Sequence, residues 1–104
     1  MKRQIFFILL SLSGQDRHGL DIQRDVLELT GGELRLWPAT LYGSLDELRE
    51  EGWIEEMVET RPEGESERKR FYRISDAGRR ALMAETRRIE GLVEVARLRM
   101  REAP

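Results

Sequence analysis

Apolar residues recur at intervals of three and four positions in four stretches of the chain, which is the spacing of amphipathic helices. The first stretch is apolar around most of its circumference, whereas the other three carry an apolar stripe on one face. Glycine or proline residues stand between the stretches. The pattern predicts helices over residues 3–13, residues 17–29, residues 38–51 and residues 76 to about 101.

The third helix is the most informative of the four. Pro38 suits a first helical position, and Gly52 suits the left-handed residue that follows a helix. Leucines at positions 41, 45 and 48 form one stripe, which leaves small and hydroxyl-bearing residues on the other faces: Thr40, Tyr42, Gly43 and Ser44. A helix of this kind could enter a DNA groove. An ordinary amphipathic surface helix would show the same pattern.

Two strands and a short extended piece complete the predicted fold. Residues 53–60 and 68–74 carry strand-favouring residues around the polar loop 61–67, which predicts a hairpin. Residues 33–36 are predicted to be extended, because the residue before a proline avoids the helical region. The order of elements is that of a winged helix-turn-helix, an α+β fold that is mainly α. In this fold the third helix would enter the major groove and the hairpin would be the wing.

The last helix is longer than a small domain can cover, because 26 residues span about 40 Å. Its positions 82, 86, 89, 93, 96 and 100 alternate steps of four and three, which is the spacing of a coiled-coil seam. We therefore predict a dimerisation helix over residues 76–104, against the alternative of a helix packed within its own chain. The first helix would supply more of the interface, whose predicted residues are Ile5, Leu9, Leu12, Leu82, Ile89, Leu92, Val93, Ala96 and Met100.

The composition argues against several kinds of functional site. The chain has 104 residues, no cysteine and one histidine, which argues against disulfides, cofactors and a metal site, and no nucleophile–base pair indicates an enzyme. The net charge is -2, but it is unevenly distributed. Residues 46–67 hold ten acidic and two basic side chains, whereas residues 68–101 hold eleven basic and four acidic ones. This polarity predicts one basic face on an acidic protein.

The N-terminus admits two interpretations. Met1–Arg3 followed by the apolar residues 5–10 is similar to a short signal peptide, although it is too short to span a bilayer. The same residues form a helical stripe of Ile5, Ile8, Leu9 and Leu12 that the predicted fold needs. We favour the helix, and with it a cytoplasmic protein.

The sequence also resembles the short type of PadR-like transcriptional regulators, over nearly its whole length. Three groups of residues carry the resemblance: Ile8–Leu12 with Arg17–Ile22; Leu36–Leu45 with Leu48, Gly52 and Ile54; and Arg70–Gly78. It implies a homodimer that binds double-stranded DNA, with effectors near the dimer interface, here Phe6, Phe7, Leu10 and residues 89–100. The candidate DNA-binding residues are His18, Pro38, Thr40, Tyr42, Ser44, Arg68, Lys69, Arg70 and Tyr72.

Three positions depart from the family pattern. Trp37 stands where the family usually has Ser or Thr, so the usual N-cap of the third helix is lost. Leu20 replaces the common Tyr, and the wing loop 63–67 is acidic where a phosphate-tracking wing should be basic or neutral. Residues 1–75 are thus expected to form a DNA-binding domain of a repressor that occludes a palindromic operator. The alternative is a protein-interaction module that has kept the fold and lost DNA binding.

Overall fold

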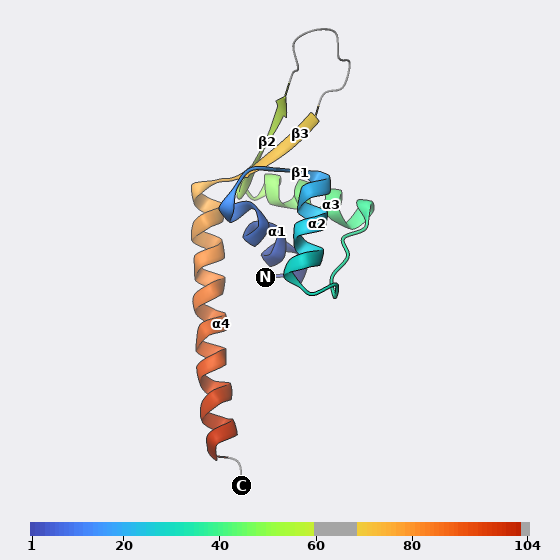
Figure 1. Ribbon diagram of the computed structural model, residues 1–104. Helices are drawn as coiled ribbons and strands as arrows, with labels where there is room; N and C mark the ends of the chain where they lie inside the picture. The colour runs from blue at the N-terminus through green and yellow to red at the C-terminus, as the bar shows by residue number, and fades with distance from the viewer. Residues whose placement is uncertain (60–68, 103–104) are drawn as a thin grey trace.

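A computed structural model describes residues 1–59 and 69–102. In this part of the chain, four helices surround a core beside a small antiparallel sheet (Figure 1). The elements in chain order are α1 (Arg3–Gly14), β1 (Arg17–His18), α2 (Gly19–Leu29), α3 (Pro38–Glu50), β2 (Ile54–Glu59), β3 (Lys69–Ile74) and α4 (Asp76–Glu102).

The helices match the sequence pattern closely, and their ends have local causes. Pro38 is the first residue of α3, and Gly52 adopts a positive φ of 74° just after the helix. Gly31 and Gly32, with φ of 60° and 88°, follow α2. Ser75 caps α4, because its Oγ accepts a hydrogen bond of 3.0 Å from the backbone N–H of Gly78.

The sheet has the strand order β1-β3-β2, with both pairs antiparallel. Residues 17 and 18 were expected to begin the second helix, but they pair with β3, with Arg17 opposite Tyr72 and His18 opposite Phe71. The short extended piece expected at residues 33–36 joins no strand and runs as an irregular segment into α3. The extra strand therefore comes before α2 rather than after it.

α1 lies at the centre of the molecule, in contact with α2, α3, α4 and β3. Three of its side chains predicted for a dimer interface, Ile5, Leu9 and Leu12, are buried in the core of this chain, and so is Leu82 of α4. These side chains of α1 are therefore covered by their own chain, whereas Phe6, Phe7 and Leu10 of the same helix are only half-buried. Leu20 of α2 is 63% exposed, because it lies about 200° around the helix from the buried Ile22.

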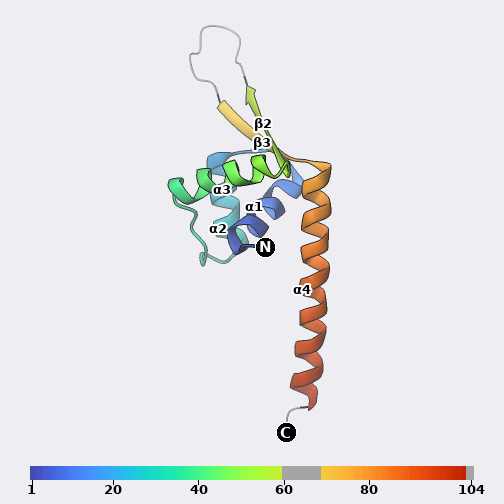
Figure 2. The same ribbon diagram turned by 180° about the vertical axis from the view of Figure 1, so that it is seen from behind.

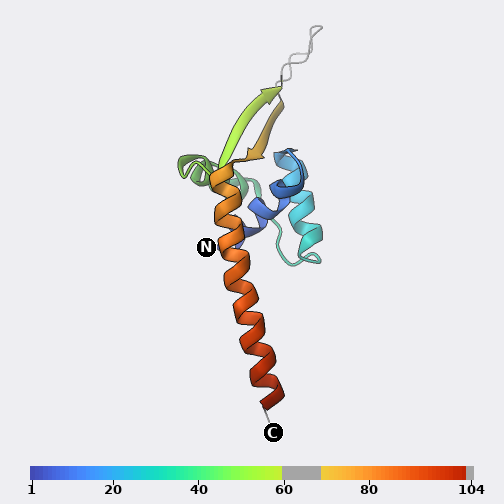
Figure 3. The same ribbon diagram turned by 90° about the vertical axis from the view of Figure 1, so that its left-hand side faces the viewer.

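α4 leaves the helical body and extends away from β2 and β3, on the opposite side of the molecule (Figures 1 and 2). Its first turn lies so close to the start of β2 that a Cβ on Gly78 would collide with the carbonyl oxygen of Trp53. Seen from the side, the helix continues well past the helical body (Figure 3), and every residue from 91 to 101 is exposed. In the described residues, no helix has the length and apolar character needed to cross a membrane.

Candidate nucleic-acid interface

The first half of α3 presents a neutral surface. Leu41, Leu45 and Leu48 are buried as predicted, and they fix which side of the helix faces outward. Ser44, predicted to contact DNA, lies on the buried side of the helix and is only 4% exposed. Pro38, Thr40 and Tyr42 are exposed, and so are two small residues that follow the outermost line of the helix, Ala39 and Gly43.

Tyr42 joins α3 to the start of α2. Its side chain is 48% exposed, and its hydroxyl oxygen lies 2.8 Å from where a Cβ on Gly19 would stand. A glycine at position 19 therefore allows α2 and the Tyr42 ring to approach closely. Around this contact, a surface hollow is lined by residues of α2, α3, β1 and β3: His18, Gly19, Leu20, Asp21, Arg24, Tyr42, Arg70 and Tyr72.

The base of the hairpin borders the same hollow. Arg70 is exposed, and its Nη1 lies 3.4 Å from Oε1 of Glu56, which also forms an ion pair with Arg49 at the end of α3. Tyr72 is buried beside them, and burial, followed by the Glu56 carboxylate, raises the pKa of its phenol. Tyr72 is thus a neutral packing residue beneath Arg70, while Arg70 offers a charged group to the surface.

His18 has a structural role at this edge. Its Nδ1 lies 3.0 Å from the backbone oxygen of Arg70, and because a carbonyl only accepts, Nδ1 must carry the proton. The ring also meets Phe71 edge to face, with centroids 5.9 Å apart. His18 therefore ties the start of α2 to β3 and sets the position of Arg70.

The comparisons with known proteins agree with this arrangement. The sequence profile described as the transcriptional regulator PadR-like family matches residues 8–84. The chain belongs to this family. No protein of curated function matches it in a comparison of sequences. The family consists of transcriptional regulators, so the expectation that the protein is not an enzyme is confirmed.

Solved structures of low sequence identity share the fold. A PadR family transcription regulator from Clostridium difficile is 18% identical, with a TM-score of 0.81 over 95% of this chain and 99% of that one. Bacillus subtilis PadR, solved in complex with operator DNA, is 24% identical with a TM-score of 0.72, over 82% of this chain and 47% of that one. The predicted winged helix-turn-helix with a long last helix is confirmed.

In this PadR-like chain, charge divides α3 into two halves. Residues 38–45 carry no charged side chain, whereas the second half carries exposed acidic residues. Two of these have basic partners: Lys2 Nζ lies 3.1 Å from Glu47 Oε1, and Arg49 Nη2 lies 3.4 Å from Asp46 Oδ1. The electrostatics of α3 therefore favour a polyanion at its uncharged N-terminal half, near the positive end of the helix dipole, over its acidic second half.

Some of the predicted DNA-binding residues cannot be placed in the structure, and the structure adds a residue that was not predicted. Arg68 and the acidic loop 63–67 lie outside the described residues, and Lys69 is placed only as the first residue of β3. Arg24, which borders the hollow from α2, was not among the predicted residues, because nothing in its sequence context singles it out. His18 and Arg24 border the same hollow because His18 belongs to the strand β1 and Arg24 to the helix α2, which the sequence pattern did not distinguish. In residues 1–59 and 69–102, no cluster of His, Asp or Glu could hold a metal ion.

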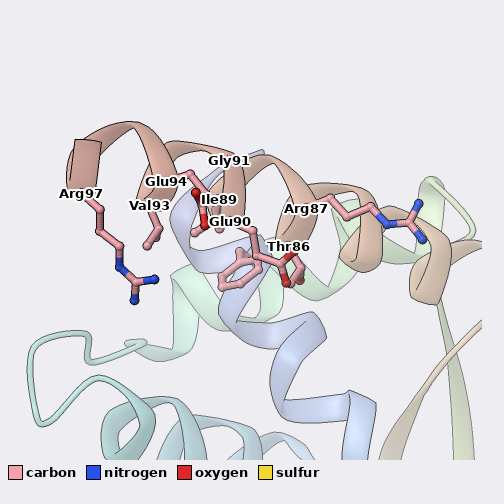
Figure 4. Close-up of a pocket in the computed structure, with 9 residues that line it drawn as sticks. Thr86, Arg87, Ile89, Glu90, Gly91, Val93, Glu94 and Arg97 are labelled. Carbon is pink, nitrogen blue, oxygen red and sulfur yellow. The ribbon is translucent and has the colours of Figure 1, made fainter. Parts of the chain in front are cut away.

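A second hollow runs along α4, away from α3. It is lined by Phe6 of α1 and by α4 residues that include Ile89, Val93 and Arg97. Figure 4 shows Val93 and Arg97 directed from α4 toward the side where α1 lies, whereas Arg87 points away along the helix. Two arginines, Arg87 and Arg97, and two glutamates, Glu90 and Glu94, surround this apolar floor, so the rim carries both signs of charge and suits the side chains of another helix.

Proposed function

We propose that two copies of the chain associate through α4 and bind a two-fold symmetric DNA operator, with one α3 in each of two major grooves. The observation that carries this proposal is the continuous face formed by the uncharged half of α3, the start of α2 and Arg70 of β3. A major groove about 12 Å wide admits one such helix. The fold is shared with Bacillus subtilis PadR, which was solved with operator DNA.

The two parts of the chain have separate tasks in this proposal. Residues 1–75 bind DNA: Thr40 and Tyr42 donate to phosphates, and Arg70 neutralises them together with Arg68 and Lys69. His18, Pro38 and Tyr72 shape the face, and Ser44 packs behind it. Residues 76–104 dimerise through the apolar stripe of α4, in which Ile89 is half-buried and Leu92, Val93, Ala96 and Met100 are exposed.

Repression would follow from occlusion, because a protein on the operator excludes the polymerase from an overlapping promoter. A small-molecule effector would bind in the hollow beside Phe6 and Ile89, which dimerisation would close. Such a molecule can release the operator only if it binds better to the arrangement of the two winged domains that does not fit DNA. Transcription in vitro from a promoter that overlaps the operator tests whether the protein represses or activates. Repression lowers the yield of transcript, and activation raises it.

The operator can be found by selecting bound sequences from a random pool of duplex DNA with the full-length protein. We expect a symmetric motif whose half-sites are centred about 34 Å apart, or a multiple of that distance. Recovery of no motif would contradict sequence-specific binding. It would favour the alternative of a protein-interaction module, which the exposed acidic residues of α3 and β2 would suit.

A matched pair of arginines on β3 tests the interface itself. Arg70 borders the hollow, whereas Arg73 lies on the other face of the strand and pairs with Asp16 at 2.8 Å. Arg70→Ala should weaken operator binding and lower the slope of log K against log salt by about one for each subunit. Arg73→Ala should leave both unchanged. Equal effects of the two variants would contradict the proposed face.

A further inference from the structure

Trp37 is an exposed indole at the entrance of α3. Its side chain is 62% exposed, and the guanidinium carbon of Arg35 lies 5.3 Å from the centre of its ring. On α2, Gln23 donates a 2.7 Å hydrogen bond to the carbonyl of Leu36, which holds the segment that carries Trp37 against the helical body. The ring is therefore held in place at the surface, on one face by Arg35 and along the chain by Gln23.

An indole in this position replaces a polar cap. Trp37 is the N-cap of α3 and offers the helix no side-chain hydrogen bond. Serine or threonine would contribute about 1 kcal/mol to the helix at this position. The chain therefore carries a large apolar surface where local stability favours a small hydroxyl, and 62% of this residue stays exposed after folding.

The groove-facing part of α3 has few means of reading bases by hydrogen bonds. Residues 38–45 include none of the side chains that make paired hydrogen bonds to base edges, such as Arg, Asn or Gln. The exposed side chains are instead largely apolar, with Leu20 of α2 beside Tyr42 and Ala39 two residues after Trp37. The apolar group on a base edge in the major groove is the C5 methyl of thymine.

We propose that Trp37 determines operator specificity by packing its exposed ring against a thymine methyl group in each half-site. The proposal rests on the proposed function, because it presumes that α3 enters the major groove. The residues at the N-terminus of a recognition helix are those that meet base edges. Arg35 holds the ring and brings its positive charge toward the flanking phosphates. The half-sites should therefore contain a thymine whose methyl group is required.

Deoxyuridine in place of thymidine tests this contact, because it removes one methyl group and leaves the base-pairing edge unchanged. Binding of the full-length protein to the selected operator is measured with deoxyuridine at each symmetric pair of thymines in turn. One pair should weaken wild-type binding by about fifteenfold, which is about fourfold for each buried methyl group. Trp37→Ser should weaken binding to the thymine operator and show no further loss with deoxyuridine at that pair.

The control is Leu29→Ser, which removes an exposed apolar side chain at the far end of α2. This variant should keep the full deoxyuridine effect. An unchanged effect in Trp37→Ser would overturn the proposal and assign the methyl contact to another residue. Wild-type binding that is insensitive at every thymine, or a motif without thymine, would overturn it too. If the protein does not bind DNA at all, the wild-type protein will show no salt-dependent binding to any duplex. That result would contradict the proposed function, and it differs from DNA binding that is insensitive to the thymine methyl group.

Discussion

At the scale of single residues, Gly43 stands out because it lies in the interior of an exposed helix. A Cβ at this position would meet no atom within 4 Å, so folding does not require glycine here. Alanine is preferred over glycine in helix interiors by about 0.8–1 kcal/mol. A close approach of the α3 backbone to the floor of a DNA groove would account for the choice.

We therefore predict that Gly43→Ala raises the free energy of unfolding by about 0.8–1 kcal/mol and weakens operator binding. Urea unfolding measures the first effect, and fluorescence anisotropy with labelled operator measures the second. Gly91→Ala is the control for helix propensity, because Gly91 lies inside α4 and a Cβ there also meets no atom within 4 Å. It should add similar stability. Operator binding by Gly43→Ala at the wild-type affinity would contradict the need for a close approach.

At the scale of elements, α4 is held to the body by a side chain that titrates. Glu85 is buried, and its Oε2 lies 3.5 Å from the amino group of Met1, which precedes α1. A hydrogen bond from Arg88 of the same helix lowers the pKa of the Glu85 carboxyl group. A carboxyl group with a lower pKa in the folded than in the unfolded state stabilises the fold above its unfolded pKa. This contribution is lost as the pH falls through the folded value.

Glu85→Gln should therefore lower the midpoint of thermal unfolding at pH 7, and the difference from wild type should shrink as the pH falls below about 4. Circular dichroism melts of both proteins at pH 7 and pH 3 provide the measurement. A difference of the same size at both pH values would mean that Glu85 acts through its shape and packing rather than through its charge.

The elements also show how far the sequence could predict this fold. The leucines of α3, Gly52 and the Ser75 cap follow from local rules, and the bounds of all four helices agree with the pattern to within two residues. The strand β1 could not be predicted, because two residues carry no period and their pairing partners lie 55 and 53 residues away. The burial of Ser44, three residues after Leu41 and four before Leu48, follows from the helical repeat, as does the exposure of Leu20 on the side of α2 opposite to Ile22. The hollow that joins α2, α3 and β3 follows from packing between elements, which a one-dimensional pattern does not contain.

At the scale of the whole molecule, the position of α4 determines how two binding faces would be arranged. The helix leaves on the side opposite to β2 and β3, so its exposed half is remote from α3 (Figure 1). A second copy joined along this half can therefore add a second α3 without covering the first. The side chains of Ile5, Leu9, Leu12 and Leu82, which belong to the core of each subunit, are not needed for this contact.

Two leucines of α4 allow this arrangement to be tested with a matched pair of variants. Leu92 and Leu98 are 54% and 50% exposed, but the helical repeat places Leu92 next to the stripe of Val93 and Ala96, and Leu98 on the opposite side. Leu92→Glu should dissociate the dimer at micromolar concentration, because a charge would be buried without a partner. Leu98→Glu should remain dimeric. Sedimentation equilibrium distinguishes the two.

The affinity of the Leu92→Glu variant for DNA then tests whether the operator is recognised by the dimer. Linking two binding units raises their joint affinity by about 10²–10⁴ over a single unit, so Leu92→Glu should bind the full palindrome at least about 100-fold more weakly than wild type. Its affinity for a single half-site should be unchanged, because every residue of the binding face is intact. Equal losses on the palindrome and the half-site would place α4 within the DNA-binding surface instead. A Leu92→Glu protein that stays dimeric would place the subunit contact elsewhere on the molecule.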